Sequence, residues 1–125
     1  MGDFVGGTLK YLRRHPVPRL TLAGGFAKLA KLGQGALDLH SGRARLDQER
    51  LAARAAATGA PDELVELIRV ANTANQILGR SLAAGYHVAD MVAAEARAVA
   101  RATAGPAIGI DVIVVDRQGA IVGRA

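Results

Sequence analysis

Residues 19–45, RLTLAGGFAKLAKLGQGALDLHSGRAR, constrain the fold of this chain more than any other segment. The apolar run at residues 20–22 predicts a strand, which the pair Gly24-Gly25 closes. Open α/β sheets bind ligands where a strand ends in glycines before a polar segment, although such a pair also makes simple turns. We therefore expect an α/β fold, with this strand buried on both faces if the sheet is parallel.

The rest of the chain is mostly helical by pattern. Apolar spacing predicts helices over residues 4–15, 26–32, 46–58, 62–71 and 87–103, while residues 72–82 either continue the fourth helix or form another. A second strand is expected over residues 108–115, followed by a turn at 116–119 and a third strand over 120–123. Three strands with five to six helices make a small sheet. We therefore expect residues 1–125 to form a single domain of a larger, two-domain α/β protein.

Composition excludes several classes of protein. Cysteine is absent, which rules out disulfides, thiolate metal ligands and a cysteine nucleophile. Histidines are too few and too dispersed for a metal site, so no metal is expected. No apolar run approaches the roughly 20 residues of a membrane span, and the first residues do not resemble a signal peptide. These features predict a cytoplasmic protein with no membrane contact.

The net charge of +5 is unevenly distributed. Residues 1–45 hold eight basic and two acidic side chains, a net +6, whereas residues 46–125 hold eight basic and nine acidic side chains, a net −1. This asymmetry suggests an anionic partner such as a nucleic acid, a phosphate or a polycarboxylate. A solvated basic face would explain it equally well.

Two lysines concentrate this charge in the helix expected over residues 26–32. Lys28 and Lys31 are three residues apart and therefore lie on one helix face. Because two neighbouring ammonium groups repel unless an anion lies between them, the pair indicates a carboxylate or phosphate ligand. The alternative is a pair of solvated lysines.

The run from Asp38 to Arg43 gathers a carboxylate, an imidazole, a hydroxyl and a guanidinium within six residues. In an extended segment Asp38 and His40 share a side, so His40 could carry a proton while Asp38 orients it. The alternative is a local hydrogen-bond network that fixes the loop, with Ser41 capping the next helix.

The sequence resembles the carboxy-terminal part of CbiD-type cobalt-precorrin-5B C1-methyltransferases of anaerobic cobalamin synthesis. The similarity spans essentially the whole chain. Its most specific parts are the GDFVG opening, the GKxxKL-like segment at residues 25–32 and the HSGR run at residues 40–43. Members of this family are considerably longer, so the resemblance implies either a missing amino-terminal half or association with other copies of the chain.

The resemblance implies transfer of a methyl group from S-adenosylmethionine to ring carbon C1 of a cobalt-bearing tetrapyrrole. This substrate carries several ionised acetate and propionate arms, which basic side chains can bind. The substrate-binding residues expected on this basis are Lys28, Lys31, Ser41 and Arg43. His40 and Asp38 are the catalytic candidates, and Gly24 and Gly25 are expected to let the backbone approach S-adenosylmethionine.

A second hypothesis is a basic binding module without catalysis, which would hold a phosphorylated ligand or nucleic acid. The chain has only two Phe, two Tyr and no Trp, too few for surfaces that stack bases. We therefore do not expect nucleic acid to be the partner.

Overall fold

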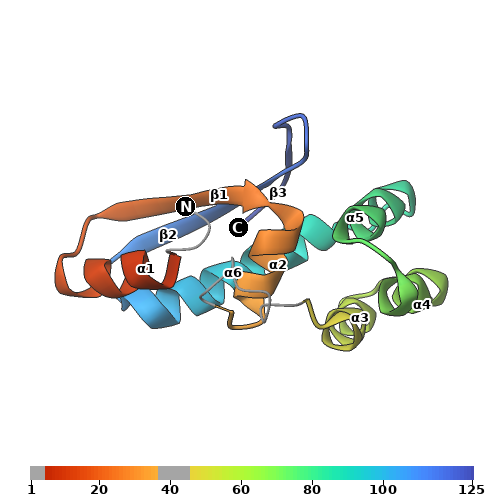
Figure 1. Ribbon diagram of the computed structural model, residues 1–125, viewed down its shortest axis with the longest axis horizontal. Coiled ribbons are helices and arrows are strands. Elements are labelled where there is room, and N and C mark those ends of the chain that lie inside the picture. The colour runs from red at the N-terminus through yellow and green to blue at the C-terminus, as the bar shows by residue number, and fades with distance from the viewer. Residues whose placement is uncertain (1–4, 37–45) are drawn as a thin grey trace.

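The computed structural model describes residues 5–36 and 46–125, and within them it contains six helices and three strands (Figure 1). The α/β class and the small sheet expected from the sequence are confirmed. In chain order the elements are α1 (Val5–Arg14), β1 (Arg19–Gly25), α2 (Phe26–Gly33), α3 (Gln48–Ala57), α4 (Asp62–Val70), α5 (Ala74–Ala83), α6 (Val88–Ala104), β2 (Gly109–Val115) and β3 (Ile121–Arg124).

The three strands form one mixed sheet in the order β1-β2-β3. β1 runs parallel to β2, from the pair Arg19 and Gly109 to the pair Gly25 and Val115, so all of α2 to α6 lies in the crossover between them. β3 returns antiparallel to β2 and has an irregular register opposite Val114 and Val115. Gly119 has φ +84° in the connecting turn, the left-handed conformation expected for a glycine there.

The prediction that β1 is buried on both faces is wrong. Only Leu22 of this strand is buried, while Thr21, Ala23 and Gly25 are exposed. β1 is an edge strand, and the helices in the described part of the chain pack on one side of the sheet (Figure 1). The central strand β2 alternates accordingly, with Ile110, Val112 and Val114 buried toward the helices.

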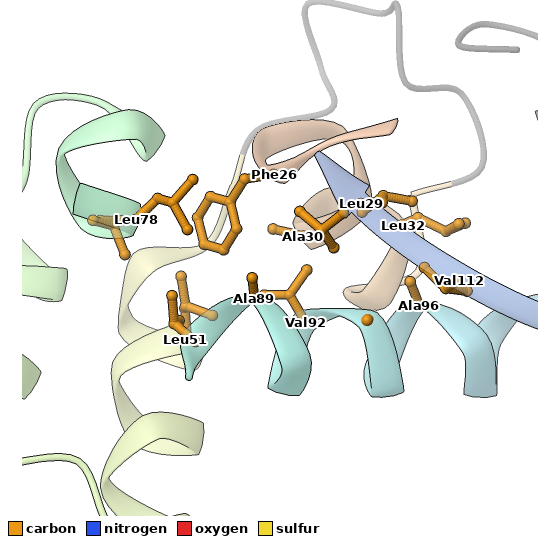
Figure 2. Packing of buried hydrophobic residues seen from close by; sticks show 14 of the residues in the cluster. Phe26, Leu29, Ala30, Leu32, Leu51, Leu78, Ala89, Val92, Ala96 and Val112 are labelled. Carbon is orange, nitrogen blue, oxygen red and sulfur yellow. The ribbon is translucent and has the colours of Figure 1, made fainter. Parts of the chain in front are cut away.

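Helix α6 is the centre of the core, and its buried face is largely alanine. Small side chains let neighbouring elements approach closely: a Cβ on Gly33 of α2 would lie 3.0 Å from the Cβ of Glu95. On Gly123 of β3, a Cβ would lie 2.4 Å from the carbonyl carbon of Ala89. Figure 2 shows the larger α2 side chains, including Phe26 and Leu32, packed over this alanine-rich helix. The core around α6 is therefore built largely from small side chains.

Residues 72–82 do not continue α4. Ala71 is extended, with φ −60° and ψ 145°, and Thr73 then caps a separate helix by accepting a hydrogen bond from the Gln76 amide at 3.1 Å. The Gln76 side chain in turn accepts from the Asn72 amide at 3.0 Å, which is a close variant of a capping box. None of the described helices is both long and apolar enough to cross a membrane.

Candidate functional site

The glycine pair lies at the carboxyl end of β1, beside the end of the parallel strand β2. Neither glycine has a positive φ; Gly25 has φ −72° and ψ 161° and precedes α2. A Cβ on Gly24 would meet only the Leu29 side chain at 3.8 Å, and one on Gly25 would meet nothing within 4 Å. Neither backbone conformation nor packing among the described residues requires glycine here. The pair therefore leaves bare backbone at the sheet edge where α/β folds bind ligands.

Helix α2 presents its two lysines differently. Its inward face buries Phe26, Leu29 and Leu32, which leaves Lys28 exposed and Lys31 half-buried. Neither lysine forms an ion pair with a residue that the structure describes. The two side chains share one side of the helix, as the spacing predicts, and Lys31 borders a surface hollow.

That hollow has a volume of about 340 Å³ and lies where α2, the start of α3 and the start of α5 meet. Its lining consists of Ala27, Lys31, Leu46, Gln48, Asn72, Thr73, Ala74 and Ile77. Gln48 fixes one wall, because its amide nitrogen donates to the carbonyls of Ile68 and Ala71, both at 2.9 Å. We call this cavity the α2/α5 hollow. The Lys31 ammonium group and the polar residues Gln48, Asn72 and Thr73 in the lining suit an anionic or polar group of a ligand.

Arg117 adds a second cation near the start of α5. When the Asn75 side-chain amide is oriented with its oxygen toward Arg117, this oxygen accepts hydrogen bonds from Arg117 Nε at 2.8 Å and from Arg117 Nη2 at 2.6 Å. This contact joins the turn between β2 and β3 to α5. Sequence reasoning treated residues 116–119 only as a turn and missed Arg117, because no local pattern shows that this turn lies beside α5.

Four of the predicted site residues, Asp38, His40, Ser41 and Arg43, lie outside the described residues. Their assignments stay predictions. Leu46, the first described residue after them, lines the α2/α5 hollow.

The ion pair between Arg19 and Asp111 serves the fold. The pKa of Arg19 is raised above its ordinary value, first because its guanidinium donates a hydrogen bond to Asp111 and second because of the Coulombic attraction between them. This pair bridges β1 and β2 at the end of the strands remote from Gly24-Gly25. Within residues 5–36 and 46–125, no three His, Asp or Glu side chains gather closely enough to hold a metal ion.

The fold is an α/β domain in which the bare glycine backbone at the end of β1 precedes a helix that carries two lysines. Residues 38–125 match the family described as CbiD, C-terminal domain. Curated relatives named cobalt-precorrin-5B C(1)-methyltransferase match nearly the whole chain. The protein of Rhodospirillum rubrum is 56% identical over 125 residues, 99% of this chain and 35% of its own length. The protein of Bradyrhizobium is 56% identical over 99% of this chain and 33% of its own length. The protein of Paramagnetospirillum magneticum is 51% identical over 100% of this chain and 35% of its own length.

The chain belongs to the CbiD family. It spans about a third of the length of the curated relatives that it matches. No solved structure matches it significantly. Residues 5–33, which precede the segment matched to the family, are part of the same packing unit, since α2 lies against α6 and β1 pairs with β2.

Proposed function

We propose that this chain is the part of a cobalt-precorrin-5B C1-methyltransferase that holds the carboxylated tetrapyrrole. The observation that carries the proposal is the identity of 50–56% to proteins of that name, across nearly the whole chain. A cytoplasmic location belongs to the same proposal, since it is the compartment expected of such a biosynthetic enzyme. As the chain spans a third of those relatives, the complete reaction is assigned to the longer enzyme.

The proposed methyl donor is S-adenosylmethionine. It would supply a methyl group on a sulfonium sulfur: the new bond forms between that methyl carbon and ring carbon C1. The bond to sulfur breaks, and its electron pair stays on the sulfur of S-adenosylhomocysteine. Such an in-line displacement gains most of its acceleration from orientation of the two reactants. The role of the protein is then to hold the two reactants in the correct relative orientation.

The described residues support separate binding sites for the tetrapyrrole and for S-adenosylmethionine. Lys31 borders the α2/α5 hollow, where its ammonium group would bind a carboxylate arm of the tetrapyrrole, and Lys28 would bind a more exposed arm. Gly24 and Gly25 would let backbone amides and carbonyls approach S-adenosylmethionine without side chains in the way. The proposal keeps His40, oriented by Asp38, as the residue for proton handling or substrate positioning, and Ser41 and Arg43 as further substrate contacts.

Calorimetric titration tests this division of roles. The Lys31→Ala variant is titrated with a stable carboxylated corrinoid and, separately, with S-adenosylhomocysteine. Lys10→Ala, which removes an exposed lysine from α1, serves as the matched control. Loss of one charge-assisted contact costs about 1.5–3 kcal/mol, so corrinoid binding should weaken by about 10-fold or more while S-adenosylhomocysteine binding changes little.

The assignment of Lys31 to the tetrapyrrole would be contradicted if Lys31→Ala weakened the binding of both ligands equally. It would also be contradicted if Lys10→Ala weakened corrinoid binding as much as Lys31→Ala does. The alternative of a non-catalytic basic module predicts a different result. It would show affinity for DNA that falls steeply with salt, and no binding of either ligand.

A further inference from the structure

The outer edge of β1 carries backbone groups that pair with no other strand in the described part of the chain. The Pro18 carbonyl accepts from the Gly109 amide at 3.0 Å, which fixes the residues whose backbone groups turn toward β2. Backbone groups alternate in direction along a strand, so Leu20, Leu22 and Gly24 also turn theirs toward β2. The amides and carbonyls of the remaining residues of β1 point away from β2; these residues are Arg19, Thr21, Ala23 and Gly25. Among the residues that the structure describes, none of these four amides has a hydrogen-bond acceptor.

The opposite edge of the sheet is protected in the ways that natural proteins use. β3 has only four residues and an irregular register against β2. At Ile110, which β3 does not reach, Arg97 of α6 donates from Nε to the carbonyl at 2.7 Å. β1, by contrast, has seven residues in unbroken register and no proline, and its one charged side chain, Arg19, is held by Asp111. It has the character of a strand with neighbours on both sides.

The face of the sheet turned away from the helices is also uncovered in the described part of the chain (Figure 1). We call it the open face and define it by Thr21, Ala23, Asp111, Ile113 and Arg124. Thr21, Ala23 and Arg124 are exposed, and Ile113 is half-buried in a hollow of about 310 Å³. Parallel strand pairs are normally covered on both faces.

We propose that the outer edge of β1 and the open face dock the rest of the CbiD polypeptide, which adds a strand to β1. About two thirds of each curated relative lies outside the match, so a covering segment of sufficient length exists in those proteins. A three-stranded sheet is also only about half the usual size for a globular domain. Strand addition to a bare edge supplies main-chain hydrogen bonds, and the open face supplies side-chain contacts. The proposal rests on family membership and not on the methyl transfer proposed above.

Amide hydrogen exchange tests the edge directly, by comparing this chain with the full-length Rhodospirillum rubrum relative. In the chain alone, the inward amides of Leu20 and Leu22 should be protected and the outward amides of Thr21 and Ala23 should exchange rapidly. In the full-length relative, the amides at the positions of Thr21 and Ala23 should exchange at least about 100-fold more slowly, as expected for a strand inside a sheet. Rapid exchange at these two positions in the full-length protein would overturn the proposal.

Binding of this chain to the remaining part of the Rhodospirillum rubrum relative, produced separately, tests the surface. Ala23→Lys places a charge on the open face beside the edge. Ala102→Lys makes the same change on an exposed position of α6 and is the control. We expect Ala23→Lys to weaken association about 10-fold or more and Ala102→Lys to leave it unchanged. Equal association of the two variants would overturn the proposal. So would a wild-type dimer in sedimentation that Ala23→Lys dissociates, because a second copy would then be the occupant.

Discussion

Replacing Gly123 by alanine should destabilise the domain strongly, because β3 lies directly against the start of α6. The added Cβ would lie 2.4 Å from the carbonyl carbon, 2.6 Å from the Cβ and 2.7 Å from the oxygen of Ala89. Favourable contacts between carbon atoms occur at about 3.5–4.0 Å, so β3 must move away from α6 by about 1 Å. That movement also strains the hydrogen bond from the Arg124 amide to the Asp90 carboxylate, now 2.9 Å long.

The cost of this substitution can be built from two contributions. Overpacking costs about 1–3 kcal/mol, and loss of a hydrogen bond to a charged group about 1.5–3 kcal/mol. Alanine offsets about 0.4–1 kcal/mol by restricting the unfolded chain, since Gly123 has no positive φ. The net expectation is a loss of about 1.5–5.5 kcal/mol in the free energy of unfolding, a large share of the stability of a small domain.

Urea denaturation of the chain, followed by the helical circular dichroism signal, measures this change. Gly79→Ala is the matched control, because Gly79 lies within α5 and a Cβ there would meet nothing within 4 Å. It should raise the free energy of unfolding by about 0.5–1 kcal/mol through helix propensity. If Gly123→Ala proves as stable as the wild type, β3 does not pack on α6 as described and the reasoning fails.

Three further predictions concern single side chains. Ser81 is fully buried, and its hydroxyl has no hydrogen-bond partner among the described residues. Ser81→Ala should therefore leave the free energy of unfolding unchanged or raise it by up to about 1 kcal/mol. A clear loss of stability in urea denaturation would indicate that the hydroxyl has a partner after all. Arg97→Met should lower the free energy of unfolding by about 1–3 kcal/mol, because the Ile110 carbonyl loses its hydrogen-bond donor. An unchanged denaturation midpoint would contradict this prediction. In the complete enzyme, His40→Ala should lower turnover with little change in melting temperature, whereas a melting drop of many degrees would favour the alternative that His40 only fixes its loop.

The elements themselves follow closely from local sequence. The turn with Asp116 and Gly119, where the carboxylate accepts from two backbone amides, did most to set the limits of β2 and β3. The sequence left open whether residues 72–82 form a separate helix, which the Thr73 cap at the start of α5 decides. The burial of β1 was predicted wrongly, because an apolar run such as that around Leu22 has the same pattern in a central strand and in an edge strand. Which of the two it is depends on residues far away in the chain.

The candidate site was predictable in part. The spacing of Lys28 and Lys31 placed them on one side of α2, but their different surroundings depend on where α5 lies, which no local pattern specifies. The contact between Asn75 and Arg117 was missed for the same reason. The roles of Asp38, His40, Ser41 and Arg43 stay predictions, since these residues lie outside the described part of the chain.

The central claim is that the α2/α5 hollow, with Lys31 in its lining, holds a carboxylated tetrapyrrole. Nuclear magnetic resonance tests it most directly, through the backbone amide shifts of the ¹⁵N-labelled chain during titration with a stable, diamagnetic carboxylated corrinoid. The account predicts that the largest shift changes cluster at Lys31, Thr73 and Ala74, which line the hollow. Changes concentrated at Thr21 and Arg124 on the open face, or no saturable change anywhere, would contradict it.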